Sequence, residues 1–361
     1  MTPSANPSPK NRKTLKQKAE RFYQQGVEEF QAARLDSARA SLDQVLLVYN
    51  QLSDHAGMAL GLLKLGRVLE LLGQYDRAQE TYKGSRDLYE GLNDPLGIAR
   101  AKAFLGNVGW AKGDYAGASR RLEESLHTFR AAGDKPGSAW VLDMLANLHL
   151  AQGKHHEAEK LHRDAYELAR EIGENPEGQA WNYYHLAAID LFRGHGEAAQ
   201  AGFLSALNLF TGLGDVLGQV AVCTHLGEIA CGQKNLAEAE RYILQALRLV
   251  VPTHCKPLLT DALTSLVRLL KARGEESKAM GILMVVLSHP TCRQQTKDRM
   301  VTLSKELQAN FSSKELESGF RWAKEFTIEE MAKAWIKVLS PKPLEHSPAK
   351  TPKPKKKGKA S

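Results

Sequence analysis

A pattern of small and apolar residues recurs every 40 residues along this chain. In the stretch 105–118, LGNVGWAKGDYAGA, a Leu-Gly pair is followed seven residues later by a glycine and five residues after that by an alanine. The same frame appears at 65–78 and at 145–158. Its turn position continues through the chain at Ala33, Gly73, Gly113, Gly153, Gly194, Lys234 and Gly274. Self-similarity at a fixed period predicts a stacked repeat architecture.

Each repeat predicts a pair of antiparallel helices. Small residues such as Gly106 and Ala118 let two helices approach closely, while one bulky leucine per repeat fills the space beside them. Connectors such as NDPLG at 93–97 stop one helix and open the next. We therefore predict an all-α fold with seven helical hairpins over residues 14–290. The connector VVPTHCKP at 250–257 departs from the pattern, so the junction between hairpins 6 and 7 is expected to differ.

This frame resembles the tetratricopeptide repeat, in a 40-residue variety. The matching residues are the Leu-Gly pair of the first helix, the G-x-Y turns at 73–75 and 113–115, and the alanine of the second helix. The resemblance implies a right-handed superhelical solenoid. Repeat 1 has Gln25 at the leucine site and repeat 7 has Val267 at the glycine site, as expected of terminal repeats that lack one neighbour.

Residues 291–340 lose the period but keep helical signals. Ser312 and Thr327 each begin an S/T-x-x-E capping box. We predict capping helices here that cover the last repeat. The segment also resembles the end of the tetratricopeptide arms of bacterial signal-transduction ATPases and AfsR-type regulators, through His289-Pro290, Lys297-Asp298-Arg299 and Glu329-Glu330. In that family the arm senses or binds, while separate domains hydrolyse nucleotide and contact DNA.

The net charge of +8 is concentrated in the two tails. Residues 1–18 hold five basic residues and no acidic one, and residues 341–361 hold seven lysines and one glutamate, so the body is slightly acidic. The Pro, Ser and Lys content of 1–13 and 341–361 predicts disorder. An alternative function is therefore a nucleic-acid-associated regulator whose tails make weak, non-specific phosphate contacts. Neither tail has an aromatic residue for base stacking, and this absence argues against the nucleic-acid-associated function.

The expected cellular compartment is inferred from membrane-spanning segments, signal regions and cysteine spacing. The longest apolar run near the C-terminal end, 282–287, is too short to span a bilayer, and the N-terminus has no apolar signal region. Four cysteines without CxxC or framework spacing favour free buried thiols in a reducing compartment. We expect a cytoplasmic protein without membrane contact.

Motifs for catalysis or cofactor binding are not found. The sequence has no G-x-x-x-x-G-K-[ST] phosphate loop and no G-x-S-x-G elbow. The nearest metal pattern, HEAEK at 156–160, has a lysine where a zincin needs its second histidine. We interpret His149, His155, His156 and His162 as ordinary polar side chains. The sequence therefore predicts no enzyme activity, no cofactor and no metal.

Partner binding is implied for the concave groove, at the second, fifth, ninth and twelfth positions of each first helix. Asn107 and Asn147 occupy equivalent ninth positions one repeat apart, where carboxamides can hold an extended peptide backbone or, alternatively, satisfy neighbouring helices. The tryptophans of the groove are either anchors for a partner or inter-repeat packing. The predicted set is Arg67, Arg100, Asn107, Trp110, Trp140, Asp143, Asn147, Trp181, Tyr184, Thr224, Glu228 and Arg268.

These observations favour a non-enzymatic scaffold or adaptor. Its expected partner is a protein that presents a peptide or a helix to the concave groove. The expected role is in signalling or regulation.

Overall fold

The computed structural model describes residues 8–340 except 174, 313, 315, 318–320 and 322–324. Within these residues the chain is helical and contains no strand. No helix among them is both long and apolar enough to cross a bilayer. The predicted tail 341–361, and residues 1–7 of the predicted tail 1–13, lie outside the described residues.

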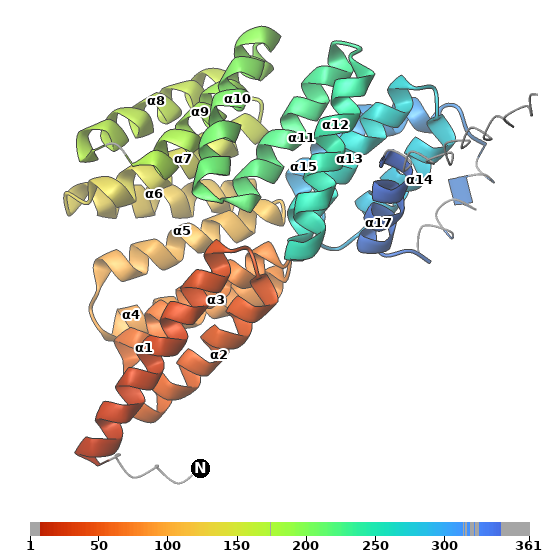
Figure 1. The fold of residues 1–361 in the computed structure, drawn as a ribbon. Coiled ribbons are helices and arrows are strands. Elements are labelled where there is room, and N and C mark those ends of the chain that lie inside the picture. The colour runs from red at the N-terminus through yellow and green to blue at the C-terminus, as the bar shows by residue number, and fades with distance from the viewer. Residues whose placement is uncertain are drawn as a thin grey trace, which may run out of the picture.

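The helices from α1 to α14 pair in chain order into seven antiparallel hairpins, as the repeat predicts (Figure 1). The pairs are α1 (Pro9–Gln31) with α2 (Leu35–Leu52), α3 (His55–Leu71) with α4 (Tyr75–Gly91), α5 (Pro95–Ala111) with α6 (Tyr115–Ala131), α7 (Lys135–Ala151) with α8 (His155–Ile172), α9 (Pro176–Phe192) with α10 (Gly196–Leu213), α11 (Val216–Gly232) with α12 (Leu236–Val250), and α13 (Lys256–Ala272) with α14 (Glu276–Ser288). The short helix η1 (Val251–Thr253), α15 (Gln294–Gln308) and α17 (Ile328–Leu339) complete the described helices.

Close contact between the two helices of a hairpin depends on the small residues of the repeat. A Cβ added at Gly106 would lie 3.1 Å from Leu122 and 3.3 Å from the carbonyl oxygen of Ala118. The repeated alanine is fully buried in all seven hairpins, at Ala38, Ala78, Ala118, Ala158, Ala199, Ala239 and Ala279. These positions hold the helix backbones close enough for neighbouring leucines to fill the remaining space.

The connectors between hairpins begin helices by side-chain capping. Asp94 accepts a hydrogen bond from the backbone N–H of Gly97 at 3.0 Å, and Asp54, Asp134 and Asp215 cap their helices in the same way. Such a cap pairs an otherwise unpaired N–H at the helix N-terminus. The Asp-x-x-Gly spacing in the sequence is therefore explained by this hydrogen bond from the glycine N–H to the aspartate side chain three residues before it.

The first helix begins earlier than the sequence analysis expected. Residues 9–13, predicted as part of a disordered tail, belong to α1. Ser8 caps the helix by accepting from the backbone N–H of Asn11, and a proline stands at the helix start. Proline is favourable in the first turn because its missing N–H has no partner there in any case.

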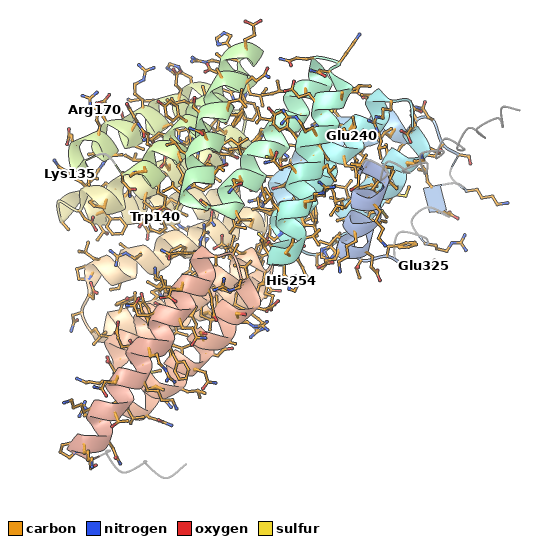
Figure 2. The ribbon with its side chains drawn as sticks, viewed as in Figure 1. Lys135, Trp140, Arg170, Glu240, His254 and Glu325 are labelled. Atoms are coloured by element: carbon orange, nitrogen blue, oxygen red, sulfur yellow. The ribbon has the colours of Figure 1, made fainter. Side chains whose placement is uncertain are left out.

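The array curves so that its last hairpins return to its first (Figure 1). The altered connector after α12 forms η1, and His254 directly after it adopts a left-handed conformation. Its Nδ1 lies 2.6 Å from Oδ2 of Asp36 on α2 (Figure 2). The irregular junction that the sequence predicts between hairpins 6 and 7 is therefore also a point of contact with hairpin 1.

The segment after α14 joins the two ends of the curve. The hydroxyl of Tyr75 donates to the backbone oxygen of Thr291 at 3.2 Å, and the hydroxyl of Tyr115 donates to Oδ2 of Asp298 at 2.5 Å. Both tyrosines belong to the G-x-Y turns of hairpins 2 and 3. The turn residues of the repeat thus hold a segment that lies about two hundred residues later in the chain.

The two C-terminal helices have different positions. Helix α17 packs against α12, α13 and α14, with Lys256 lying 3.6 Å from Glu329 and Arg248 donating to Ser340 at 2.8 Å. The predicted capping box at Thr327 is present, with reciprocal bonds to Glu330. Helix α15 packs against α14 and also reaches across to α5. The predicted capping segment 291–340 therefore contacts the last repeat through both α15 and α17, and α15 extends beyond it to hairpin 3.

The first prediction concerns the repeated alanine. Ala118→Leu and Ala158→Leu should each lower the free energy of unfolding by about 1–3 kcal/mol, because the added atoms enter a contact that is fully buried. Urea denaturation provides the measurement. Ala201→Leu on the exposed face of α10 is the control and should change stability little. Equal losses at all three sites would contradict the assigned register.

The second prediction concerns closure of the curve. Gly73 and Gly153 both have φ of +73°, so alanine should cost each about 1–2 kcal/mol in backbone strain. A Cβ at Gly73 would also lie 2.4 Å from the side chain of Thr291, whereas a Cβ at Gly153 would have nothing within 4 Å. Gly73→Ala should therefore destabilise more than Gly153→Ala and raise hydrogen exchange in 291–299. Identical losses without that exchange would show that the segment does not dock on hairpin 2.

Candidate functional site

The predicted partner-binding residues lie on six first helices that follow one another along the array. Arg67 is on α3; Arg100, Asn107 and Trp110 are on α5; Trp140, Asp143 and Asn147 are on α7; Trp181 and Tyr184 are on α9; Thr224 and Glu228 are on α11; and Arg268 is on α13. All of them except Thr224 are partly exposed. We call the surface formed by these first helices the inner face.

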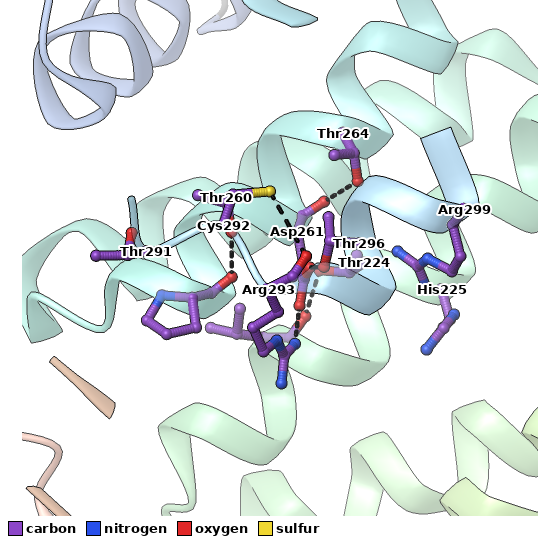
Figure 3. Close-up of polar contacts among 12 residues, drawn as sticks. Thr224, His225, Thr260, Asp261, Thr264, Thr291, Cys292, Arg293, Thr296 and Arg299 are labelled. Atoms are coloured by element: carbon purple, nitrogen blue, oxygen red, sulfur yellow. Dashed lines mark hydrogen bonds and ion pairs between the residues drawn. The ribbon is translucent and has the colours of Figure 1, made fainter. Parts of the chain in front are cut away.

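Helix α15 and the turn before it contact the C-terminal part of the inner face, at Asp261 (Figure 3). Asp261 on α13, which is 7% exposed, accepts hydrogen bonds from the hydroxyl of Thr296 at 2.6 Å and from the guanidinium of Arg293. The charge-assisted bond to Arg293 neutralises a carboxylate that would be costly to bury alone. The inner face of α13 is therefore occupied by the chain itself.

A second ionic cluster extends this contact to α11. Glu228 Oε1 lies 3.5 Å from Nε of Arg268 and 3.8 Å from Nη2 of Arg299 on α15, and Oε2 lies 3.6 Å from Nδ1 of His225. Burial alone would raise the pKa of Glu228, but these cationic neighbours, Arg299 foremost, hold it well below its usual range. Glu228 thus stays ionised, and its charge is used within the chain.

Three groove predictions need correction on this basis. Thr224 is 4% exposed and its hydroxyl donates to the backbone oxygen of Val220, so it does not line an open groove. Glu228 pairs with Arg268 and with Arg299 on α15. These charges are therefore used within the chain and not on an open groove.

Tyr184 belongs to the edge of the covered region. Its hydroxyl lies 3.0 Å from Nε2 of His225, and its ring meets that of Phe203 edge to face. Burial raises the pKa of Tyr184 to about 12, so the hydroxyl stays protonated near neutral pH and can donate. Tyr184 therefore links α9 to α11 through a hydrogen bond.

Glu70 organises the N-terminal part of the inner face. Its carboxylate is 7% exposed and lies 3.2 Å from Nη1 of Arg67. The hydroxyl of Tyr82 donates to it at 3.1 Å, and the side-chain amide of Asn107 donates to it from the next hairpin. The side-chain N–H group of Asn107 therefore hydrogen-bonds to a neighbouring helix, which is the alternative to holding a peptide backbone.

The tryptophans of the inner face pack against neighbouring side chains but keep some exposure. The ring of Trp140, labelled in Figure 2, lies 4.8 Å from that of Phe104, which stacks on Tyr82 at 5.0 Å. Trp181 meets Phe210 edge to face at 4.9 Å. Trp110 packs against the core of hairpins 3 and 4, and its indole N–H is buried with no hydrogen-bond partner among the described residues. Inter-repeat packing therefore describes Trp140 and Trp110, whereas the ring contacts of Trp181 lie within hairpin 5.

The open part of the inner face is centred on α7. Trp140, Asp143 and Asn147 are spaced by three and four residues, so they share one stripe of this helix. Asn147 is half-buried and makes no side-chain hydrogen bond to another described residue. Arg100 on α5 is 43% exposed at its side chain, and its nearest carboxylate, Asp134, is 3.9 Å away. The stripe thus offers the unpaired amide of Asn147 beside an aromatic ring, and Arg100 adds an exposed cation from α5.

Sequence reasoning missed one polar cluster beside this stripe. Asp143, His162 and His185 come from α7, α8 and α9, and His162 Nδ1 lies 3.0 Å from Asp143 Oδ1. The two imidazoles stack with centroids 4.4 Å apart. His162 Nε2 and His185 Nδ1 are buried and have no hydrogen-bond partner among the described residues, at a cost of about 1–3 kcal/mol each.

A signal for this cluster is present in the repeat itself. His162 stands four residues after the repeated alanine of hairpin 4. In the other six hairpins this register position holds a buried apolar residue: Leu42, Tyr82, Leu122, Phe203, Ile243 and Leu283. Aligning the second helices on their alanines would have identified His162 as a polar residue in a core position.

Comparison with known protein families identifies the same repeat in part of the array. A family model described as tetratricopeptide repeat matches residues 97–171, which span the helices from α5 to α8. No curated protein matches the sequence. Solved structures supply a fold likeness over a larger part of the chain.

Two Rap proteins and one phosphatase are among the similar structures. The Rap conjugation gene regulator of plasmid pLS20, in complex with the Phr* peptide, is 16% identical with a TM-score of 0.65, covering 84% of this chain and 81% of that one. A Rap protein complexed with competence and sporulation factor is 14% identical with a TM-score of 0.54, covering 91% and 100%. Aspartyl phosphate phosphatase F from Bacillus subtilis is 12% identical with a TM-score of 0.58, covering 79% and 73%.

At these identities the likeness to solved structures is one of fold. It extends the match of residues 97–171 to an array of helical hairpins on both sides. Residues 97–171 therefore match the tetratricopeptide repeat, and the described helices on both sides share the helical-hairpin fold of these structures.

Proposed function

We propose that this chain is a non-enzymatic scaffold or adaptor that binds a peptide or helix of a partner protein on the open part of the inner face. The observation that carries this proposal is the stripe of Trp140, Asp143 and Asn147 on α7. It combines the edge of an aromatic ring, a partly exposed carboxylate, and an amide that has no hydrogen-bond partner among the described residues. Arg100 on α5 adds an exposed cation to the same surface. Such a mixture suits a polypeptide, which presents both backbone amides and side chains.

The bound peptide would lie along α5, α7 and α9, because α15 covers the inner faces of α11 and α13. Of the predicted groove residues, Arg67, Asn107, Trp110, Trp181 and Tyr184 would border the peptide through their exposed atoms. Glu228 would contribute only by holding α15 through Arg299 and Arg268 only by pairing with Glu228, while Thr224 is buried within α11. The surface for the partner is therefore shorter than the full set of seven hairpins.

Fold likeness supports this proposal in one respect. Two of the similar structures, both Rap proteins, are described as complexes with a peptide or with competence and sporulation factor. One of them is called a conjugation gene regulator. We accordingly propose a role in signalling or regulation in the cytoplasm, with no catalytic step, since the sequence has neither a phosphate loop nor a nucleophile elbow.

The third prediction tests the α7 stripe. Peptides selected from a random library on the immobilised protein should lose affinity for Asn147→Ala by roughly 2- to 13-fold, the effect of one hydrogen bond of about 0.5–1.5 kcal/mol. Trp140→Ala should weaken binding further if its exposed edge anchors the peptide. Fluorescence anisotropy gives the dissociation constants, and thermal unfolding shows whether Trp140→Ala still folds.

Arg120→Ala, on the exposed face of the second helix α6, is the matched control and should leave affinity unchanged. Asn107→Ala also removes a partner of Glu70, so it tests stability as well as binding. Loss of binding in Arg120→Ala, with none in Asn147→Ala, would move the partner to the outer face and overturn the assigned site.

The fourth prediction addresses the lysine-rich tail as the alternative contact. Deletion of residues 341–361 should leave the unfolding temperature and peptide affinity unchanged, because the remaining chain holds the stripe on α7. Any filter-bound nucleic acid should decrease with this deletion and with rising salt. Sequence-preferring, salt-resistant nucleic-acid binding by the truncated chain would instead favour the nucleic-acid-associated function.

A further inference from the structure

The polar cluster of Asp143, His162 and His185 lies where three helices of hairpins 4 and 5 meet. In the part of the chain that the structure describes, it is the only group of three or more His, Cys, Asp or Glu side chains whose ligand atoms come together. One ligand atom from each residue lies within 4.8 Å of the other two. The cluster is not used by the peptide-binding proposal apart from Asp143.

Burial makes this cluster unusual among the histidines of the chain. The side chain of His162 is 2% exposed and His185 is 8% exposed, whereas Asp143 is 28% exposed at its side chain. His162 occupies a register position that is apolar in the other six hairpins. A polar ring placed in a core position, next to a second buried ring, indicates a requirement other than packing.

The hydrogen-bonding inventory shows what the cluster lacks. A neutral imidazole has one N–H donor and one lone-pair acceptor, so each ring needs two partners. His162 Nε2 and His185 Nδ1 have none among the described residues, although both atoms are buried. The carboxylate of Asp143 has no lysine or arginine partner within those residues either. Within the cluster only His162 Nδ1 and Asp143 pair with each other among the described residues, while the stacked His185 brings in a buried nitrogen without a partner.

We propose that Asp143, His162 and His185 bind a divalent transition-metal ion of the zinc class, which fastens hairpin 4 to hairpin 5. Two imidazoles and one carboxylate match the ligands that zinc prefers, whereas calcium and magnesium require oxygen ligands throughout. A water molecule can complete a tetrahedral site on the side of Asp143, which is the exposed member and supplies the entry path.

The spacing of the ligands fits such an ion after one local movement. Zinc bonds of about 2.0–2.1 Å place neighbouring tetrahedral ligand atoms about 3.3 Å apart. His162 Nδ1 and Asp143 Oδ1 are 3.0 Å apart and already meet this requirement. The planes of the stacked rings differ by 19°, so their in-plane lone pairs lie in two nearly parallel planes, and His185 must turn out of the stack to direct a nitrogen at the ion.

The position of the cluster gives the ion a structural role. His185 is on α9, between the turn positions Gly153 and Gly194, which are 41 residues apart where the other turns are 40 apart. Helices α8 and α9 pack less extensively than the helices at the other junctions between hairpins. An ion bound to α7, α8 and α9 would restrain the angle at this junction. The site shares Asp143 with the peptide-binding stripe, but Zn²⁺ binding can be measured without a peptide, so failure of one proposal is distinguishable from failure of the other.

The test uses the full chain after removal of metals with a chelator. Titration with Zn²⁺ by calorimetry should show one site per chain, and Co²⁺ should give the visible absorption of a tetrahedral complex that Zn²⁺ then removes. Asp143→Asn and His185→Ala should weaken Zn²⁺ binding by about 100-fold or more, since even the loss of an outer supporting partner costs about 10- to 100-fold. Zn²⁺ should raise the unfolding temperature of the unmodified chain and not of these variants.

His127→Ala and His156→Ala, which remove exposed histidines from the neighbouring helices α6 and α8, are the matched controls and should bind Zn²⁺ normally. Circular dichroism establishes that each variant is folded. If His185→Ala does not fold, Asp143→Asn still decides the question, because Asp143 is partly exposed and Asn has nearly the same shape. Zn²⁺ binding that disappears with the control histidines, or that persists unchanged in Asp143→Asn, would overturn the proposal.

Discussion

A helical hairpin of this kind cannot bury its apolar face by itself, and the rest of the structure depends on that constraint. Within each hairpin the buried alanine and its small partner bring two helices into contact. The remaining apolar face must then be covered by the next hairpin, and stacking continues until something else covers the last face. Helix α17 does so at the C-terminal end, where Ile328 and Ala332 are fully buried.

The covered half of the inner face follows from a different requirement, that of a buried charge. Asp261 is nearly inaccessible on α13, and its carboxylate needs both a cation and a hydrogen-bond donor. Arg293 and Thr296 supply them from the segment that leads into α15. A buried ion pair of this type adds specificity more reliably than it adds net stability, because both charges must leave water. It therefore explains why α15 docks at this point, and it leaves the partner surface on α5, α7 and α9.

Hairpin 4 shows how one departure from the repeat changes the chemistry. The position held by His162 is apolar elsewhere, and its ring brings unsatisfied nitrogen atoms into the contact with hairpin 5. Burial lowers the pKa of the neighbouring His185 to about 4, so that ring is neutral near pH 7 and keeps a lone pair. The same junction carries the extra residue of the repeat and packs less extensively. Irregular sequence, polar burial and loose packing thus coincide at one place.

The 40-residue period alone determined the hairpins, their connectors and the order in which they stack. Each of these features arises from contacts between residues close in the sequence, such as Gly106 with Leu122 or Asp94 with Gly97. Asn107 and Trp140 could be placed on the inner face for the same reason, but their use of Glu70 and Phe104 as partners could not.

Only the tertiary structure decided that the inner face is half covered and that three helices gather Asp143, His162 and His185. Those arrangements depend on how small angles between successive hairpins accumulate into a curve. Tyr75 meets Thr291 only because that accumulated curve returns the chain to its first hairpins. The repeat pattern specifies the angle between two successive hairpins only approximately. The small errors add up over seven hairpins, so contacts between residues about two hundred positions apart could not be predicted from the sequence.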